Sequence, residues 1–266
     1  MKILTFDTST DVMYVTLGND NNVEAYRISG LRAEAEEVAL PLRNAVKGEQ
    51  PRGGLRAEAE EVALPLRNAV KGEKSKSYNS AYLLPVIIEL LQSLNLTMQD
   101  IEAIGVNIGP GSFTGIRASA TVAKVMAQQL DVPVVGVSSP EIYSLLNTTD
   151  KNTLCLLDAR RGKAYMAVYG QDESIILEPH AVEYEKVAEY AQNNDVFIIS
   201  DNKMSEVIKE VGLECINLSE AEENMGFYLA KLTYKHLQGG NLDAFKWYNL
   251  KPLYIQPPPI SMPKVK

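Results

Sequence analysis

This sequence of 266 residues contains few of the side chains from which metal sites and nucleophilic sites are built. It has two histidines and two cysteines. His180 and His236 are far apart, so no pair lies at helical spacing, and a zinc or iron site of the usual kind is not expected. Cys155 and Cys215 are isolated, which favours buried or reduced thiols over a disulfide. The composition therefore predicts no metal and no other cofactor.

Positive charge and long apolar runs are also scarce. The chain has 26 basic and 34 acidic residues, a net charge of −8, which is the wrong sign for gripping a phosphate backbone over a broad surface. We therefore expect any nucleic acid to be held through a partner. There is no run of about twenty apolar residues and no N-terminal signal segment. These absences predict a soluble, cytoplasmic protein that does not contact a membrane.

One segment is present twice. Residues 30–49 recur letter for letter as residues 54–73. Structural repeats normally drift in sequence and occur in about three or more copies, so this identity suggests a recent duplication or an engineered insertion. Each copy has the pattern of a short helix, residues 33–40 in the first, that a proline interrupts. We interpret residues 30–73 as a surface insertion, with a partner-binding arm as the alternative.

The rest of the first half is typical of an α/β domain. Three short strands at residues 2–8, 12–17 and 23–28 predict an antiparallel meander, and the almost wholly apolar first strand is expected at the centre of the sheet. The predicted elements that follow are a helix at 80–94, a strand at 103–107, a helix at 114–130, a strand at 132–137 and a short helix at 140–146.

The second half repeats the opening pattern of strand, acid, turn, strand and strand. After a polar linker, Asp158-Ala159-Arg160 follows an apolar strand just as Asp7-Thr8-Ser9 does in the first half. We therefore expect an N-terminal domain at 1–146, a C-terminal domain at 147–256 and a flexible tail at 257–266. Further strands are predicted at 153–158, 163–169, 174–177 and 196–199, and helices at 183–192, 205–211 and 224–237.

The helices at 80–94 and 114–130 carry more apolar and small side chains than one sheet can cover. Either they pack on their own sheet, or they form a helix–helix interface with another chain. On the second interpretation the interface residues are Leu84, Ile87, Leu91, Gly109, Gly111, Gly115, Ala120, Ala123 and Ala127.

The most distinctive motif joins strand 103–107 to the second helix. Residues 109–117 are Gly-Pro-Gly-Ser-Phe-Thr-Gly-Ile-Arg, and their three glycines permit a close approach by a backbone or a ligand. The spacing is not that of a dinucleotide-binding loop, and the lysine of a phosphate-binding loop is missing. An anion site, a partner contact and a plain structural turn all fit this pattern.

Four motifs together resemble the TsaB family, also called YeaZ. They are Lys-Ile-Leu-Thr-Phe-Asp-Thr-Ser at 2–9, Asn-Ser-Ala-Tyr-Leu-Leu-Pro at 79–85, the glycine motif at 109–117 and Leu-Asp-Ala-Arg-Arg-Gly-Lys-Ala-Tyr at 157–165. The resemblance implies an α/β, two-domain actin-like ATPase fold (ASKHA, RNase H-like), in which each domain is a mixed sheet flanked by helices. It also implies a non-catalytic scaffold that dimerises and binds TsaD. With TsaE, that scaffold supports threonylcarbamoyl transfer to adenosine 37 of tRNAs reading ANN codons.

The resemblance also bears on catalysis. The paralogous subunit TsaD holds a metal with two histidines, and the corresponding positions here are Ser139 and Tyr143, neither of which supplies a neutral nitrogen ligand. Asn79 stands where the family usually has histidine. Asp7, Thr8 and Asp158 are the vestigial candidates for a magnesium-bound phosphate, with strand-end turn formers as the alternative.

Three functional classes follow from these residues. The first is the scaffold, and the second is an enzyme acting alone, either an ATP hydrolase using Asp7 and Asp158 or a metallopeptidase. The third is a tRNA-binding module, which the net charge disfavours. Arg160, Arg161 and Lys163 form a small basic cluster that suits RNA or an acidic partner, or is simply a solvated strand end.

Overall fold

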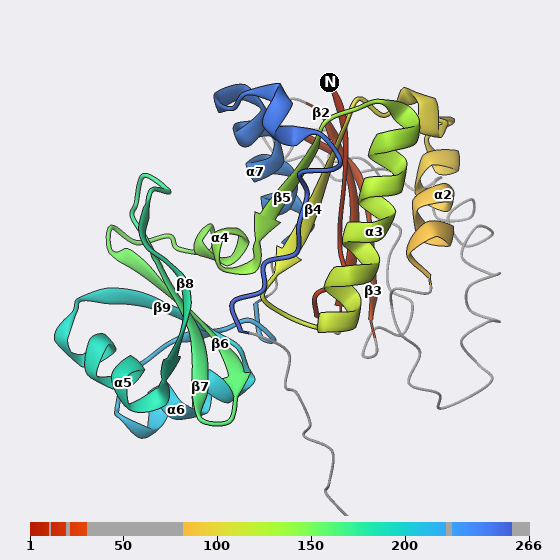
Figure 1. Ribbon diagram of the computed structural model, residues 1–266. Coiled ribbons are helices and arrows are strands. Elements are labelled where there is room, and N and C mark those ends of the chain that lie inside the picture. The colour runs from red at the N-terminus through yellow and green to blue at the C-terminus, as the bar shows by residue number, and fades with distance from the viewer. Residues whose placement is uncertain (11, 20–21, 31–81, 222–224, 257–266) are drawn as a thin grey trace, which may run out of the picture. The chain divides into compact units, whose positions relative to one another are not determined.

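The computed structural model describes the chain except for residues 11, 20–21, 31–81, 222–224 and 257–266 (Figure 1). Residues 31–73 of the predicted insertion, the helix expected at 33–40 and the tail at 257–266 therefore lie outside the described residues. The chain forms two compact units. The first comprises Met1–Val137 and Asn224–Pro252, and the second comprises Ser138–Glu223 and Leu253–Lys266.

The first unit is built on one mixed sheet. The apolar strand β1 (Lys2–Asp7) lies at its centre, antiparallel to β2 (Val12–Asn19) and parallel to β4 (Ala103–Gly109). Strand β3 (Asn22–Gly30) pairs with β2, and β5 (Val134–Ser138) lies beyond β4, which gives the order β3-β2-β1-β4-β5. The predicted antiparallel meander is therefore confirmed.

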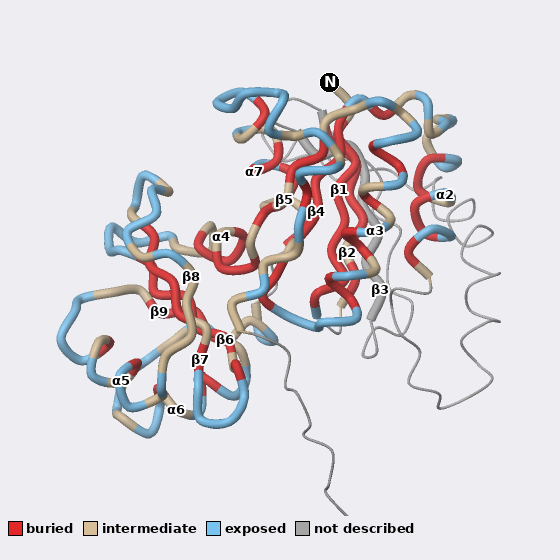
Figure 2. The backbone as a smooth tube through the Cα atoms, viewed as in Figure 1, coloured by how far each residue is buried: buried red, intermediate tan, exposed pale blue. Residues whose placement is uncertain are grey.

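Helices α2 (Leu83–Ser93) and α3 (Phe113–Leu130) cover one face of this sheet. Because side chains alternate along a strand, Leu4 and Phe6 of β1 both point into the core under these helices, and both are fully buried. Pro85 lies in the first turn of α2, where its missing N–H has no helical partner to lose. Figure 2 shows the resulting buried layer in β1, β4 and the inner sides of both helices.

A helix from the far end of the sequence also packs on this sheet. Helix α7 (Met225–Gly239) contacts β1, β2 and β4, and its Thr233 lies against the position where Gly105 lacks a side chain. Since Leu4 and Phe6 face α2 and α3, the alternate residues of the central strands require this second cover. The last element of the unit is the short 3-10 helix η3 (Leu242–Phe245).

The structure therefore divides the chain differently from the expected domains at 1–146 and 147–256. Helix α7 lies in the expected C-terminal domain but belongs to the first unit, whereas the short helix α4 (Ser139–Ser144) belongs to the second. The physical reason is that both faces of the first sheet are buried: α2 and α3 cover one face, and α7 packs on β1, β2 and β4, where Thr5 and Thr16 are fully buried.

The second unit repeats the topology of the first. Its central strand β6 (Asn152–Arg160) is antiparallel to β7 (Lys163–Tyr169) and parallel to β9 (Val196–Ser200). With β8 (Ile175–Glu183) and β10 (Ile216–Asn217) at the edges, the order is β8-β7-β6-β9-β10, which matches β3-β2-β1-β4-β5 position by position. The repetition predicted from the sequence is confirmed.

Helices α5 (Tyr184–Asn193) and α6 (Asn202–Glu210) cover one face of the second sheet. They enclose a core to which alternate residues of β6 and β7 contribute, while α4 contacts the same two strands. The buried residues of this core are Leu154, Leu156, Ala164, Met166, Val168, Val187, Ala191, Ile198, Met204 and Ile208.

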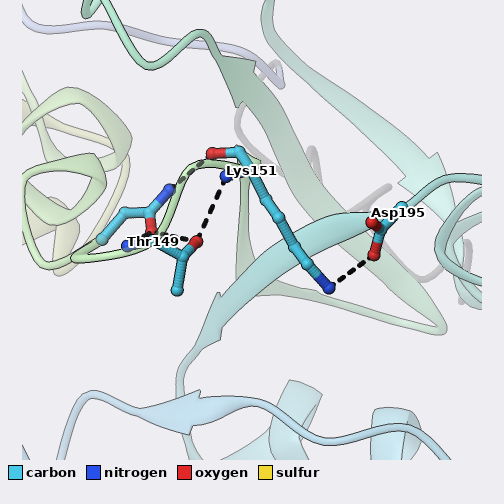
Figure 3. Close-up of polar contacts among 4 residues, drawn as sticks. Thr149, Lys151 and Asp195 are labelled. Carbon is cyan, nitrogen blue, oxygen red and sulfur yellow. Dashed lines mark hydrogen bonds and ion pairs between the residues drawn. The ribbon is translucent and has the colours of Figure 1, made fainter.

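The expected interdomain linker is an ordered turn inside the second unit (Figure 3). The Asn147 amide donates to Lys151 O at 2.7 Å and to Thr153 Oγ1 at 2.8 Å, and Asn147 Oδ1 accepts the Thr149 N–H at 2.8 Å. Lys151 Nζ forms an ion pair with Asp195 Oδ1 at 2.5 Å. This turn joins the segment before β6 to the segment before β9.

The two sides of α2 predict effects of very different size for the same truncation. Leu90 is fully buried in the first core, and we expect Leu90→Ala to lower the free energy of unfolding by about 2–5 kcal/mol, because it leaves a cavity. Leu84 is 46% exposed, and Leu84→Ala should change it by less than about 0.5 kcal/mol. Urea unfolding followed by circular dichroism measures both, and equal effects would contradict the packing of α2.

Candidate functional site

Two turns meet at the carboxyl edge of the first sheet. Because β1 and β4 are adjacent and parallel, Asp7 at the end of β1 lies beside Asn107 near the end of β4. Asp7 Oδ1 accepts the Ser9 N–H at 2.6 Å, and Asp7 Oδ2 accepts Asn107 Nδ2–H at 2.8 Å. Both carboxylate oxygens are thus engaged within the protein, and the side chain is buried.

Asn107 links the two turns. Its Nδ2 also donates to Ser9 Oγ at 3.0 Å, while its Oδ1 accepts the Gly109 N–H at 2.7 Å. The side chain is completely buried. Asn107 was not among the residues expected from the sequence. Its signal is a single amide at the end of an apolar strand, directly before a glycine turn.

Burial raises the pKa of Asp7 above its ordinary value, and the hydrogen bonds from Ser9 and Asn107 oppose this effect. A raised pKa in the folded state means that the folded chain holds this proton more tightly than the unfolded chain. Asp7 therefore contributes stability at low pH that is lost as the pH rises through the folded pKa.

The glycine turn is packed against the Asp7-Thr8-Ser9 turn. The Ser112 N–H, at the start of α3, donates to Ser9 O at 2.7 Å, and Thr8 Oγ1 donates to Gly115 O at 2.8 Å. A Cβ on Gly115 would overlap the Thr8 carbonyl oxygen, and one on Gly111 would lie 2.7 Å from Ser9 O.

Gly109 has a φ of +99°, a conformation that side chains other than glycine rarely adopt. Ser112 then caps α3 by accepting the Gly115 N–H at 3.3 Å. The Ser112 and Gly115 N–H groups, which an anion at this helix start would use, thus donate within the chain itself.

The equivalent acid of the second unit organises a different network. Asp158 Oδ1 accepts the Arg160 N–H at 2.7 Å and the Tyr184 hydroxyl at 2.8 Å, and the Asp158 N–H donates to Asp201 Oδ2 at 2.6 Å. Burial, aided by the negative charge of Asp158, raises the pKa of Asp201. Burial and the hydrogen bond to Asp158 raise the pKa of Tyr184 to about 12. Neither Tyr184 nor Asp201 was expected from the sequence.

Of the nine candidate interface residues, seven are buried and two are exposed. Five of them are buried within their own unit, in the core beneath α2 and α3: Ile87, Leu91, Ala120, Ala123 and Ala127. Gly109 and Gly115 are buried at the turn, Gly111 is exposed there, and Leu84 is exposed on α2. Direct contact with a partner through Ala120 or Ala123 is therefore ruled out in this conformation, because these small side chains let α3 approach its own sheet.

Two further groups named from the sequence lie in the second unit. Ser139 and Tyr143 are both buried in α4. Within the described part of the chain, no group of three or more His, Cys, Asp or Glu residues is placed to hold a metal ion. No helix in the same part is long and apolar enough to cross a membrane.

The two sheets have the same strand order, and each central strand has one antiparallel and one parallel neighbour. This repetition defines a two-domain actin-like fold of the RNase H-like type. YeaZ from Pseudomonas aeruginosa has the same fold, with a TM-score of 0.63 over 95% of this chain and 99% of that chain at 19% identity.

Comparison with known sequences identifies the protein family to which the chain belongs. The family model of TsaD, tRNA N6-adenosine threonylcarbamoyltransferase, matches residues 70–238, more than half of the chain. The TsaB protein of Bacillus subtilis is 36% identical over 95 residues, and that of Escherichia coli is 34% identical over 96 residues. Each match spans 35% of this chain. It covers 42% of the Bacillus subtilis protein and 41% of the Escherichia coli protein, so the chain matches about two fifths of the length of each relative. The chain belongs to the family that this model describes, and the curated relatives and the structural match named here are TsaB and YeaZ proteins.

The buried junction predicts a pH-dependent defect in Asn107→Asp. The substitution removes the Nδ2 donor that bonds Asp7. It also places a second carboxylate beside Asp7, which adds like-charge repulsion. We expect the free energy of unfolding to fall by about 3 kcal/mol near pH 7, and less near pH 5, where a shared proton relieves the repulsion. Urea midpoints at the two pH values test this, and a defect independent of pH would contradict it.

The close packing of the turns predicts that Gly115→Ala is costly. The new methyl group must displace the Thr8 carbonyl, so we expect a loss of about 2–4 kcal/mol in unfolding free energy. Gly239→Ala, at the end of α7, is the matched control because nothing lies near its Cβ position. Thermal unfolding should leave the control within about 0.5 kcal/mol of the parent, and a neutral Gly115→Ala would disprove the close approach.

Proposed function

We propose that this chain is a non-catalytic scaffold subunit of tRNA threonylcarbamoyladenosine biosynthesis. In this role it binds a TsaD subunit and, through it, TsaE. The complex supports threonylcarbamoyl transfer to adenosine 37 of tRNAs that read ANN codons. The curated relatives are named as biosynthesis proteins of this modification, which supports the pathway. The tRNA is bound only through the complex and not by this chain alone, and the chain works in the cytoplasm.

The observation that carries the non-catalytic role is the closed junction of the two turns. In an actin-like ATPase the acid after the first strand and the adjacent glycine turn face the nucleotide phosphates. Here both oxygens of Asp7 accept internal hydrogen bonds, and the Ser112 N–H donates to Ser9 O. A phosphate would have to break these bonds and displace backbone atoms. This geometry favours a structural turn over an ATP hydrolase.

The partner-binding role rests on the outer side of α2 and α3. Four large apolar side chains there are 45–53% exposed: Leu84 and Ile88 on α2, and Phe113 and Val125 on α3. We call these four residues the α2–α3 face. Arg117 lies 5.1 Å from the Phe113 ring centroid and is itself exposed. Such a face in a chain of net charge −8 is typical of a surface that another protein covers.

The dimensions of the α2–α3 face suit a helical partner. Helix α3 has 18 residues, a length of about 27 Å, and α2 lies over the same sheet face. Two such helices can supply the roughly 800 Å² per partner that a stable interface needs. Because this chain matches the TsaD family model, a TsaD subunit should present an equivalent pair of helices. A second copy of this chain presents the same pair, so we expect a homodimer in the absence of TsaD.

Charges on the α2–α3 face should abolish assembly without unfolding the chain. We expect Ile88→Lys combined with Val125→Glu to lose co-elution with TsaD from the same organism, because both side chains are exposed and would be buried at the interface. The control is Leu242→Lys, since Leu242 is 59% exposed on η3 of the same unit. Size-exclusion chromatography measures assembly, and thermal unfolding confirms folding.

Two results would contradict this proposal. If the double variant still co-elutes with TsaD, the interface lies elsewhere. If calorimetry detects stoichiometric magnesium-ATP binding with turnover by the isolated chain, the role is not that of a scaffold alone.

A further inference from the structure

The hairpin between β6 and β7 has an unusual backbone. Arg160 pairs with Lys163 across a two-residue turn, and three successive residues have positive φ: Arg160 at 64°, Arg161 at 54° and Gly162 at 73°. Two-residue hairpin turns of this type favour Asn-Gly or Asp-Gly, because short polar side chains tolerate left-handed backbone angles. Arginine is a costly residue at the first two of these positions.

Contacts beneath the turn hold it in this conformation. The Arg160 N–H donates to Asp158 Oδ1 at 2.7 Å, and Gly162 O accepts the Tyr184 N–H at 3.1 Å. Each of these bonds uses backbone atoms of the turn, so neither depends on an arginine side chain. Local stability therefore does not explain why arginine stands at these two positions.

The arginine side chains are available for binding. Arg160 and Arg161 are exposed, and among the described residues neither guanidinium forms an ion pair. Lys163, the third basic residue of the cluster, is paired with Glu183 at 3.3 Å. The turn thus presents two exposed guanidinium groups whose planar donors match phosphate oxygens.

An aromatic residue follows on the neighbouring strand, two positions beyond Lys163, the cross-strand partner of Arg160. Tyr165 on β7 is half-buried, and no hydrogen bond of its hydroxyl occurs among the described residues. Burial raises the pKa of Tyr165, and the positive charge of Arg160 opposes this effect, which places the two groups within electrostatic range. Guanidinium groups beside an aromatic ring suit a nucleic acid, which offers both phosphates and stacking bases, better than an acidic protein, which offers charge alone.

We infer that the Arg160-Arg161 turn is a contact site for the RNA backbone, used when tRNA is bound to the complex of this chain with TsaD. The inference rests on the proposed function and assigns a substrate contact to this subunit. Because the chain has a net charge of −8, these two arginines supply one local contact to the RNA and do not form an RNA-binding surface by themselves.

The decisive variant is Arg160→Asn with Arg161→Asn. It places Asn-Gly at turn positions 161 and 162, puts a residue that tolerates positive φ at position 160, and removes both charges. We expect Tm to rise by about a few degrees. In the complex with TsaD, binding of a labelled tRNA transcript should weaken, and the slope of log affinity against log salt should fall by about 1 for each arginine. Lys209→Asn with Lys246→Asn, at two other exposed basic positions, is the charge-matched control and should leave the slope nearly unchanged.

A lower Tm for the asparagine variant, or an unchanged affinity and salt slope, would overturn the inference. So would a variant that loses TsaD instead of tRNA, because the turn would then contact an acidic protein surface. If the parent chain does not bind TsaD, the proposed function fails. The tRNA titration is then made with the isolated chain at low salt, where the same difference in slope is expected.

Discussion

The first unit depends on one buried junction. The Asn107 amide joins the end of β4 to the end of β1 through Asp7 and Ser9, and it accepts the N–H of Gly109 at the start of the glycine turn. With no exposure to water, these polar groups are stable only because they satisfy one another. The same group of hydrogen bonds therefore fixes the ends of β1 and β4 and the start of the glycine turn that leads into α3.

The second unit shows how the same topology can be put to a different use. Asp158 occupies the position that Asp7 has in the first unit, but it organises the β6–β7 turn, α5 and Asp201. In the first unit the acid is sealed beneath a turn. In the second it supports a turn that carries two exposed arginines. One fold, duplicated, thus provides a closed structural junction and an exposed charged hairpin.

On α2 and α3, the side chains that stabilise the fold lie on one side of each helix, and the exposed apolar side chains lie on the other. The small residues of α3 bring the helix close to its sheet, so they stabilise the unit itself. The opposite side of the same helices carries Leu84, Ile88, Phe113 and Val125, which the described residues leave exposed. An interface built from these side chains, as proposed, can form or dissociate without disturbing the core.

The sequence by itself determined the order of strands and helices, the internal repetition and the family motifs, because hydrophobic periodicity and turn residues act locally. It did not show that α7 returns to the first sheet, that Asn107 closes the junction, or that Ala120 and Ala123 face inward. The apolar pattern of 114–130 fits both an inner and an outer face. Only tertiary structure decided between them, because burial and hydrogen-bond partners depend on which distant segments meet in space.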